Sequence, residues 1–155
     1  MTWLTASAAG ASEFDRVFGL RPNLYDDYRA FISLFGSLRP IDPVILDLCR
    51  LRIAQLLGAD AGLCLQQFSA DTSRLPQEKI AALENWQAAG AFSARERACL
   101  AFAEKFVLHP HGVTDEDAAA VTAHLSAKEM VAFTEALAVI DGFTRFRIIL
   151  GIGSS

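Results

Sequence analysis

The sequence predicts an all-α protein of six or seven helices in a single domain spanning residues 1–155. Apolar residues recur at helical spacing along most of the chain, whereas the strict alternation typical of strands is rare. The chain has 155 residues, of which 52% are hydrophobic and 21% are charged. That length is typical of one domain, and that composition excludes disordered and collagen-like proteins.

The first half of the chain carries two clear helix signals. Residues 24–36 have an apolar face at intervals of four, three and four residues, which is the spacing of one side of a helix. This face consists of Leu24, Tyr28, Phe31 and Phe35. A second helix is predicted to begin at Asp42 as N-cap, with Pro43 at the first helical position, and to end at Gly58.

The second half of the chain is predicted to contain the remaining helices. Residues 60–72 and 76–89 are each expected to be helical, the former pairing with the helix before Gly58 as an antiparallel hairpin. Capping boxes then predict three helix starts, at Ser93–Glu96, Thr114–Asp117 and Ser126–Glu129. Loops are expected at residues 37–41, 90–92 and 109–113, which contain Gly, Pro or Ser.

Charge and hydropathy exclude several classes of protein. Lys and Arg number 14 against 18 Asp and Glu, giving a net charge of −4, which argues against a general nucleic-acid binder. Mean hydropathy is +0.28, but no run of apolar residues is long enough to span a bilayer. The first residues lack the basic and apolar regions of a secretory signal. We therefore expect a cytoplasmic protein without membrane segments, and no cofactor is implied.

The most informative stretch runs from Asp47 to Gln66, DLCRLRIAQLLGADAGLCLQ. It resembles, without a gap, the motif of the carboxymuconolactone decarboxylase and alkylhydroperoxidase D (AhpD-like) family. ERACLAFAE at 96–104, VTD at 113–115, HLS at 124–126 and GFTRFR at 142–147 are also similar to that family. The resemblance covers about residues 24–152. It implies the AhpD-like helical fold, assembly into trimers or hexamers, and peroxidase or decarboxylase chemistry.

The chain departs from this family at the residues that carry the chemistry. Asp47 stands at the position of the relay glutamate, Ala59 and Gly62 at those of the two redox cysteines, and Gln66 at that of the histidine. Reduction of a peroxide by thiols requires an attacking thiolate, a resolving thiol and a base. Alanine and glycine supply no thiol, and glutamine has no titratable proton, so the resemblance implies a degenerate active site.

The three cysteines are predicted to be structural. Cys64 lies two residues beyond the second family cysteine, about 200° around the helix, and is a weak thiol candidate. Cys49 and Cys99 lie among apolar neighbours and are expected in the core. Three cysteines so widely spaced do not predict a disulfide framework.

A few polar residues have both a structural and a functional interpretation. Asp47 either faces a small pocket or pairs with Arg50 on its own helix. Gln66 either binds a ligand or bonds to its neighbours. Arg145 either holds an anionic ligand or a neighbouring subunit, or pairs with Asp141 and helix-end carbonyls.

The histidines do not predict a metal site. His109 and His111 lie together in a loop but lack a nearby third ligand, so a solvated turn is expected there. His124 fits the C-terminal end of a helix, where an imidazole interacts favourably with the helix dipole.

Three functions follow from these residues. The first is a family member without the thiol peroxidase centre that binds a small ligand, such as an organic acid, or acts in assembly. The second is an active enzyme with lactone or decarboxylase-type acid–base chemistry, and the third is a thiol-dependent peroxidase that uses Cys64. Apolar residues spread around both the 43–57 and the 131–150 helices, so self-association is expected.

Overall fold

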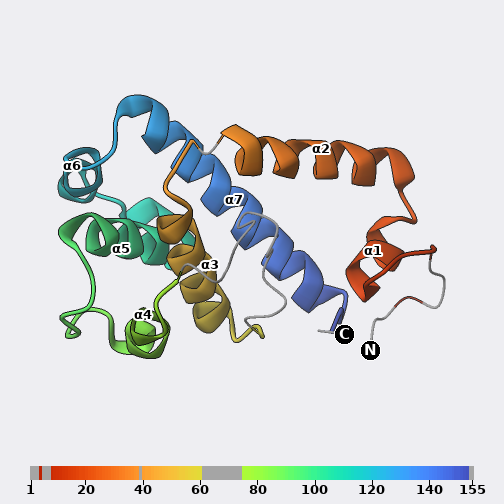
Figure 1. The fold of residues 1–155 in the computed structure, drawn as a ribbon, viewed down its shortest axis with the longest axis horizontal. Helices are drawn as coiled ribbons and strands as arrows, with labels where there is room; N and C mark the ends of the chain where they lie inside the picture. The colour runs from red at the N-terminus through yellow and green to blue at the C-terminus, as the bar shows by residue number, and fades with distance from the viewer. Residues whose placement is uncertain (1–3, 5–7, 39, 61–74, 154–155) are drawn as a thin grey trace.

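The computed structural model describes residues 4, 8–38, 40–60 and 75–153, and over these residues the protein is helical with no strand (Figure 1). The prediction of an all-α protein is confirmed. Seven α-helices lie in the described part of the chain: α1 (Glu13–Phe18), α2 (Pro22–Leu38), α3 (Pro43–Leu57), α4 (Gln77–Ala82), α5 (Ala94–Leu108), α6 (Asp115–Thr122) and α7 (Ala127–Ile149). Short 3₁₀ turns follow α4 and α5, at Leu83–Asn85 and Pro110–Gly112.

The predicted helix ends are confirmed where local chemistry sets them. Helices α5, α6 and α7 begin at the three predicted capping boxes, each with both reciprocal hydrogen bonds present. Asp42 caps α3 by accepting a hydrogen bond from the Val44 amide, and Gly58 ends α3 in the left-handed conformation at φ 64°. Residues with a Cβ rarely adopt that φ, so glycine at this position fixes where α3 stops.

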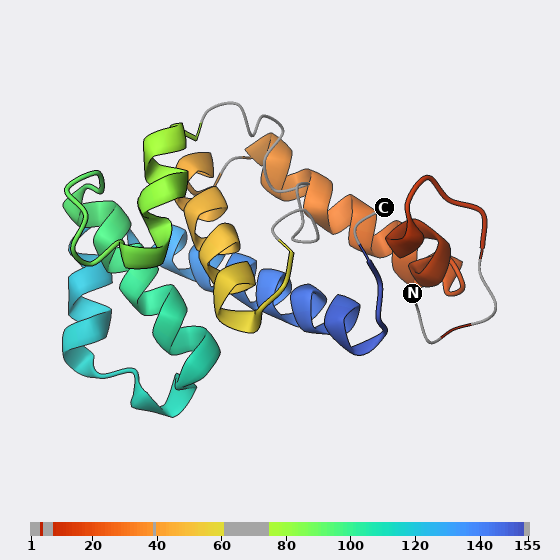
Figure 2. The same ribbon diagram turned by 90° about the horizontal axis from the view of Figure 1, so that it is seen from below.

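Helix α7 crosses the whole molecule and connects its two halves. The first half of α7 packs with α3, α5 and α6, whereas its C-terminal half lies beside α1 and α2 (Figures 1 and 2). Gly153, just beyond α7, donates its amide hydrogen to the Glu13 carboxylate at 2.8 Å. The C-terminal end of the described chain is therefore attached to α1.

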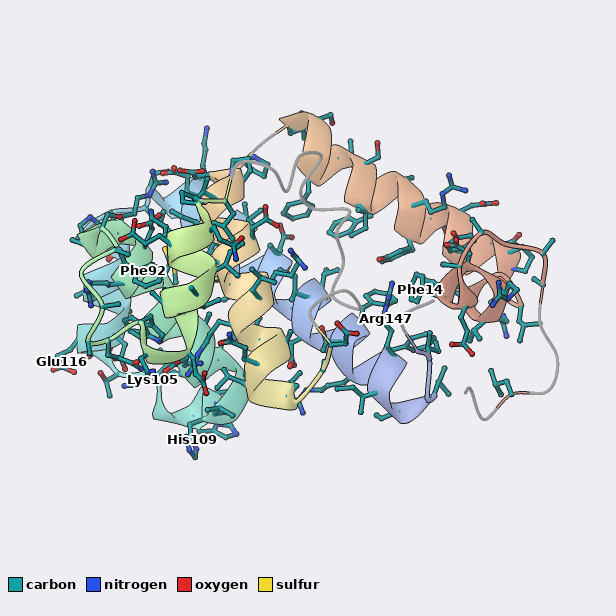
Figure 3. The ribbon with its side chains drawn as sticks, turned by 60° about the horizontal axis from the view of Figure 1, so that its bottom comes forward. Phe14, Phe92, Lys105, His109, Glu116 and Arg147 are labelled. Carbon is teal, nitrogen blue, oxygen red and sulfur yellow. The ribbon has the colours of Figure 1, made fainter. Side chains whose placement is uncertain are left out.

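An aromatic cluster joins α1 and α2 to α7. The Tyr28 and Phe143 rings lie 4.4 Å apart between centroids, and further ring pairs lie within 6.2 Å. The members are Phe14, Phe18, Tyr25, Tyr28, Phe143 and Phe146. The Arg147 guanidinium lies over the Phe14 ring, 4.1 Å from its centroid (Figure 3). Such ring pairs stabilise by about 0.5–1.5 kcal/mol beyond their burial, so the cluster holds the arm formed by α1 and α2 in place.

Helix α3 forms the centre of the other half of the molecule. Every residue from Ile45 to Arg50 is buried, including both charged ones. The apolar faces of α3, from which self-association was expected, are thus largely covered by the chain itself. Its neighbours α5 and α7 contribute Leu100, Phe133, Leu137 and Ile140, all 0% exposed.

The apolar face predicted over 24–36 is only half covered. Tyr28 and Phe35 are buried, together with Ile32, whereas Leu24 is 53% exposed and Phe31 37% exposed. Leu34 and Leu38 extend the uncovered side of the helix. Part of the apolar face of α2 therefore remains exposed to solvent.

The predicted 76–89 helix is shorter than expected. Helix α4 ends at Ala82 and a 3₁₀ turn follows. The guanidinium of Arg97 donates hydrogen bonds to the backbone carbonyls of Trp86 at 3.1 Å, Gln87 at 3.0 Å and Phe92 at 3.2 Å, and also to that of Ala89. These carbonyls lie in the turns that follow α4, so Arg97 stabilises a non-helical path of the chain where the end of the predicted helix was expected. Apart from Asp60, the predicted 60–72 helix lies outside the described residues, so the expected hairpin partner of α3 is not described.

The described helices contain no segment long and apolar enough to cross a membrane.

Replacing Arg97 should destabilise the fold strongly. Hydrogen bonds to a charged group contribute about 1.5–3 kcal/mol each, and carbonyls left unpaired add a desolvation cost. We expect Arg97→Ala to lower the free energy of unfolding by about 3 kcal/mol or more. Chemical denaturation monitored by circular dichroism measures this change. The exposed Arg21 is the matched control, and Arg21→Ala should change stability by less than about 0.5 kcal/mol. Equal effects of the two substitutions would contradict this role of Arg97.

Candidate functional site

Asp47, the candidate relay acid, lies inside the protein on α3. Its side chain is 4% exposed and that of Arg50 is 5% exposed. The Arg50 Nε atom donates a hydrogen bond to Asp47 Oδ1 at 3.2 Å, one helical turn further along. The structural interpretation of Asp47 as the partner of Arg50 thus describes a contact that is present. A carboxylate with a cation against it and little contact with solvent is poorly placed to exchange protons with a substrate.

Ala59 follows directly after the turn that ends α3. Its amide donates to the Ala54 carbonyl at 2.9 Å, which completes the helix cap around Gly58. The Ala59 side chain is a half-buried methyl group. About 15 Å of helix separate Asp47 from the end of α3, at 1.5 Å per residue, so α3 alone does not bring these two positions together. Gly62, Cys64 and Gln66 lie outside the described residues.

The two described cysteines are buried in the core. Cys49 on α3 and Cys99 on α5 are both 0% exposed. Burial raises the pKa of the Cys49 thiol well above its ordinary value, and the neighbouring Cys99 adds to this effect. Burial likewise raises the pKa of Cys99 to about 11. Both thiols are therefore protonated at neutral pH, and a protonated, inaccessible thiol is a poor nucleophile.

Arg145, a candidate ligand-binding residue, makes both of its expected structural contacts. Its Nε atom donates to the Asp141 carboxylate at 2.8 Å, and its Nη2 atom donates to the Val107 carbonyl at 3.3 Å. Val107 lies in the last turn of α5, where carbonyls lack helical partners. The side chain remains 45% exposed, so part of the guanidinium faces solvent.

The histidines lie at helix ends on the surface. His109 caps the C-terminus of α5 and His111 follows in the 3₁₀ turn, at the far end of the molecule from the aromatic cluster (Figure 3). His124 lies just beyond α6, with its amide bonded to the Val121 carbonyl. Among the described residues, no group of three or more His, Cys, Asp or Glu side chains is arranged to hold a metal ion.

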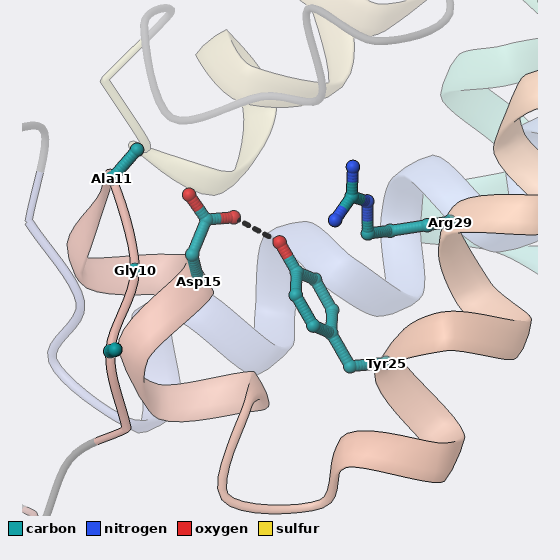
Figure 4. Close-up of a pocket in the computed structure, with 6 residues that line it drawn as sticks. Gly10, Ala11, Asp15, Tyr25 and Arg29 are labelled. Atoms are coloured by element: carbon teal, nitrogen blue, oxygen red, sulfur yellow. Dashed lines mark hydrogen bonds between the residues drawn. The ribbon is translucent and has the colours of Figure 1, made fainter.

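A pocket that the sequence did not predict lies between α1 and α2. Its volume is about 370 Å³ and it opens to solvent. The lining residues are Ala9, Gly10, Ala11, Asp15, Tyr25 and Arg29 (Figure 4). The Tyr25 hydroxyl donates a hydrogen bond to Asp15 Oδ1, and the Arg29 guanidinium lies 5.6 Å from the centroid of the Tyr25 ring. One carboxylate, one phenol and one guanidinium thus face a common space.

The ionisable groups of this pocket have fixed charges at neutral pH. Partial burial raises the pKa of Asp15, but hydrogen bonds from Tyr25 and Ser12 and the charge of Arg29 outweigh it, so the pKa is lowered overall. Burial and the bond to Asp15 raise the pKa of the Tyr25 phenol. Asp15 is therefore ionised and Tyr25 protonated at pH 7. Groups with fixed charge can attract a charged molecule but do not exchange protons with it near neutrality.

Local signals for part of this pocket were present in the sequence. Ser12 and Asp15 have the spacing of a capping box, and both of its hydrogen bonds form at the start of α1. Tyr25 and Arg29 are four residues apart, which places them on the same side of a helix. No local pattern predicts that α1 folds against α2, because that contact depends on the aromatic cluster.

Comparisons with known proteins identify the fold of this chain but not its activity. No family model matches the chain. An uncharacterised protein of Escherichia coli strain K12, YnjA, is 28% identical over 145 residues, which cover 88% of this chain and 76% of YnjA. The crystal structure of a protein of unknown function from Agrobacterium tumefaciens, named there as a candidate antioxidant defence protein AhpD, superposes with a TM-score of 0.70. That match covers 86% of this chain and 92% of the other at 16% identity.

A TM-score of 0.70 is high enough to identify the fold. At 16% identity, the similarity supports no conclusion beyond the fold. The described helices and this match together show that the chain has the AhpD-like helical fold.

Proposed function

We propose that this protein is a divergent AhpD-like protein without a thiol peroxidase centre, and that it works by binding a small organic acid. The observation that carries the proposal is that no described cysteine is placed to act as a nucleophile. Cys49 and Cys99 are buried and protonated, and Ala59 and Gly62 stand at the positions that resemble the redox cysteines.

The contacts of Asp47 favour binding over acid–base catalysis. A decarboxylase or lactone-type reaction would need a group that exchanges protons with the substrate. Asp47 is 3% exposed and paired with Arg50, and the sequence has Gln66 in place of the family histidine. The groups that are accessible to a small molecule, in the pocket between α1 and α2, carry fixed charges instead.

We also propose that the protein self-associates, as a trimer or hexamer, through α2. The support is the uncovered apolar side of α2, where Leu24, Phe31, Leu34 and Leu38 are 37–71% exposed. Contiguous exposed apolar patches on soluble proteins mark contact surfaces. The ends of α7 expose further apolar residues, Val131, Ile148 and Ile149. The resemblance to a family of trimers and hexamers supports the same assembly.

The protein should not reduce peroxides at the expense of a dithiol. We expect no turnover of an organic hydroperoxide with dithiothreitol above the rate of the uncatalysed reaction. Mass spectrometry after alkylation of the native protein should show Cys49 and Cys99 unmodified until the chain is unfolded, because both thiols are buried and protonated. Steady turnover that Cys64→Ser abolishes would contradict the proposal.

The purified protein should have a mass that is a multiple of 16.8 kDa. Light scattering after size exclusion at micromolar concentration measures it. We expect Leu34→Glu to shift the protein towards smaller species, because it places a charge in the uncovered apolar side of α2. Leu108, 49% exposed at the end of α5, is the matched control, and Leu108→Glu should leave the mass unchanged. A monomer at all concentrations would disprove assembly, and equal effects of both variants would disprove the role of α2.

A further inference from the structure

The pocket between α1 and α2 holds opposite charges on the two sides of one tyrosine. Asp15 lies on α1, whereas Tyr25 and Arg29 lie on α2, one turn apart (Figure 4). Asp15 and Arg29 line the same pocket, and the charge of Arg29 contributes to the lowered pKa of Asp15. They do not form an ion pair, since no described carboxylate lies within 4 Å of the Arg29 guanidinium. The charges are therefore left to interact with something that enters the pocket.

The hydrogen bonds that Asp15 and Tyr25 can still accept indicate which chemical group of a ligand would bind beside them. The Tyr25 hydroxyl has committed its proton to Asp15, so its oxygen can only accept further hydrogen bonds. The Asp15 carboxylate accepts from Tyr25 and from Ser12, and with about four acceptor sites on its two oxygens it keeps capacity for a further hydrogen bond. These oxygens offer acceptors and negative charge, which suits an ammonium group.

The other end of the pocket suits a carboxylate. The Arg29 guanidinium lies 5.6 Å from the centroid of the Tyr25 ring, within cation–π range, and its side chain remains exposed at the mouth of the pocket. A guanidinium offers parallel N–H donors that match the two oxygens of a carboxylate. An anion without an ammonium group would be repelled by Asp15, and a simple cation would be repelled by Arg29.

The remaining wall is built from small residues that keep the space open. A Cβ atom at Gly10 would lie 2.7 Å from Asp15 Cβ and 2.9 Å from the Arg16 amide nitrogen. Glycine therefore allows the chain to pass close against α1, and its neighbours Ala9 and Ala11 add only methyl groups. A volume of about 370 Å³ is at the small end of the range for ligand pockets.

We propose that this pocket binds a free amino acid or a similar small zwitterion, with its ammonium group at Asp15 and Tyr25 and its carboxylate at Arg29. This inference rests on the proposed function, binding of a small organic acid, and names the site and the class of ligand. Asp47 and Arg145, which the sequence first suggested for a ligand, do not line this pocket.

Calorimetric titration of the intact protein with each standard amino acid tests the proposal. We expect at least one to bind with one site per chain. The carboxylic acid that lacks its amino group, and the amide that lacks its free carboxylate, should each bind about tenfold more weakly or not at all, because each leaves one charge of the pocket unpaired.

Variants at the pocket locate the site. Arg29→Gln should weaken binding about tenfold or more, and Tyr25→Phe should weaken it by a smaller factor. Arg21 is exposed on the same arm but does not line the pocket, so Arg21→Gln should bind as the wild type does. Circular dichroism confirms that each variant is folded. Asp15 is left unchanged because it also caps α1.

Two results would overturn the inference, and both are distinct from failure of the proposed function. No heat with any amino acid at millimolar concentration would exclude this class of ligand. Binding that survives Arg29→Gln, or that is as strong for acids without an amino group, would show a ligand site elsewhere in a protein that still binds organic acids. Failure of the proposed function itself appears separately, as peroxide turnover.

Discussion

The buried ion pair between Asp47 and Arg50 is the constraint on which the core depends. The part of α3 from Ile45 to Arg50 is buried by the rest of the chain. The charged side chains of Asp47 and Arg50 therefore lie away from water. An isolated buried charge costs several kcal/mol, and the cost falls only when an opposite charge lies in hydrogen-bond contact. With Arg50 Nε at 3.2 Å from Asp47 Oδ1, the helix can lie at the centre of the fold with its charges compensated. The same pairing occupies the carboxylate that the family resemblance suggests for proton transfer.

A second polar group, the Glu104 carboxylate, connects α3 to its neighbours. Glu104 on α5 accepts hydrogen bonds from Arg52 at 2.6 Å and from the indole of Trp86 at 2.8 Å on the same oxygen, Oε1. Three separate segments, α3, α5 and the turn after α4, thereby meet at one carboxylate. In this region partly shielded polar contacts add to an apolar core, whereas the α1–α2 arm is held by aromatic rings against α7. Helix α7 packs against both halves, and the candidate ligand pocket belongs to the half with the aromatic cluster.

Helix starts were predictable from sequence because capping is local. Ser93, Thr114 and Ser126 each form a hydrogen bond with a residue three positions away. Gly58 ends α3 because it adopts the left-handed backbone conformation there. Contacts between distant residues were not predictable. Arg97 binds carbonyls in the turns after α4, five to eleven residues before it, and the Asp15–Tyr25 contact requires α1 to fold back on α2. The chemistry of the site was predictable only in part. The identities at 59 and 62 can be read from the sequence, but the burial of Asp47, Cys49 and Cys99 follows from packing.

The coupling energy between Asp47 and Arg50 tests this account most directly. It is measured by the free energies of unfolding of Asp47→Leu, Arg50→Met and the double variant. Arg50→Met removes the cation bonded to the buried Asp47 carboxylate, and Asp47→Leu removes the carboxylate bonded to the buried Arg50 guanidinium, so each should cost about 3–5 kcal/mol. The double variant removes both charges, so it should be at least about 1 kcal/mol more stable than the sum of the single effects predicts. Additive effects, within about 0.5 kcal/mol, would contradict a mutual ion pair at the centre of the fold.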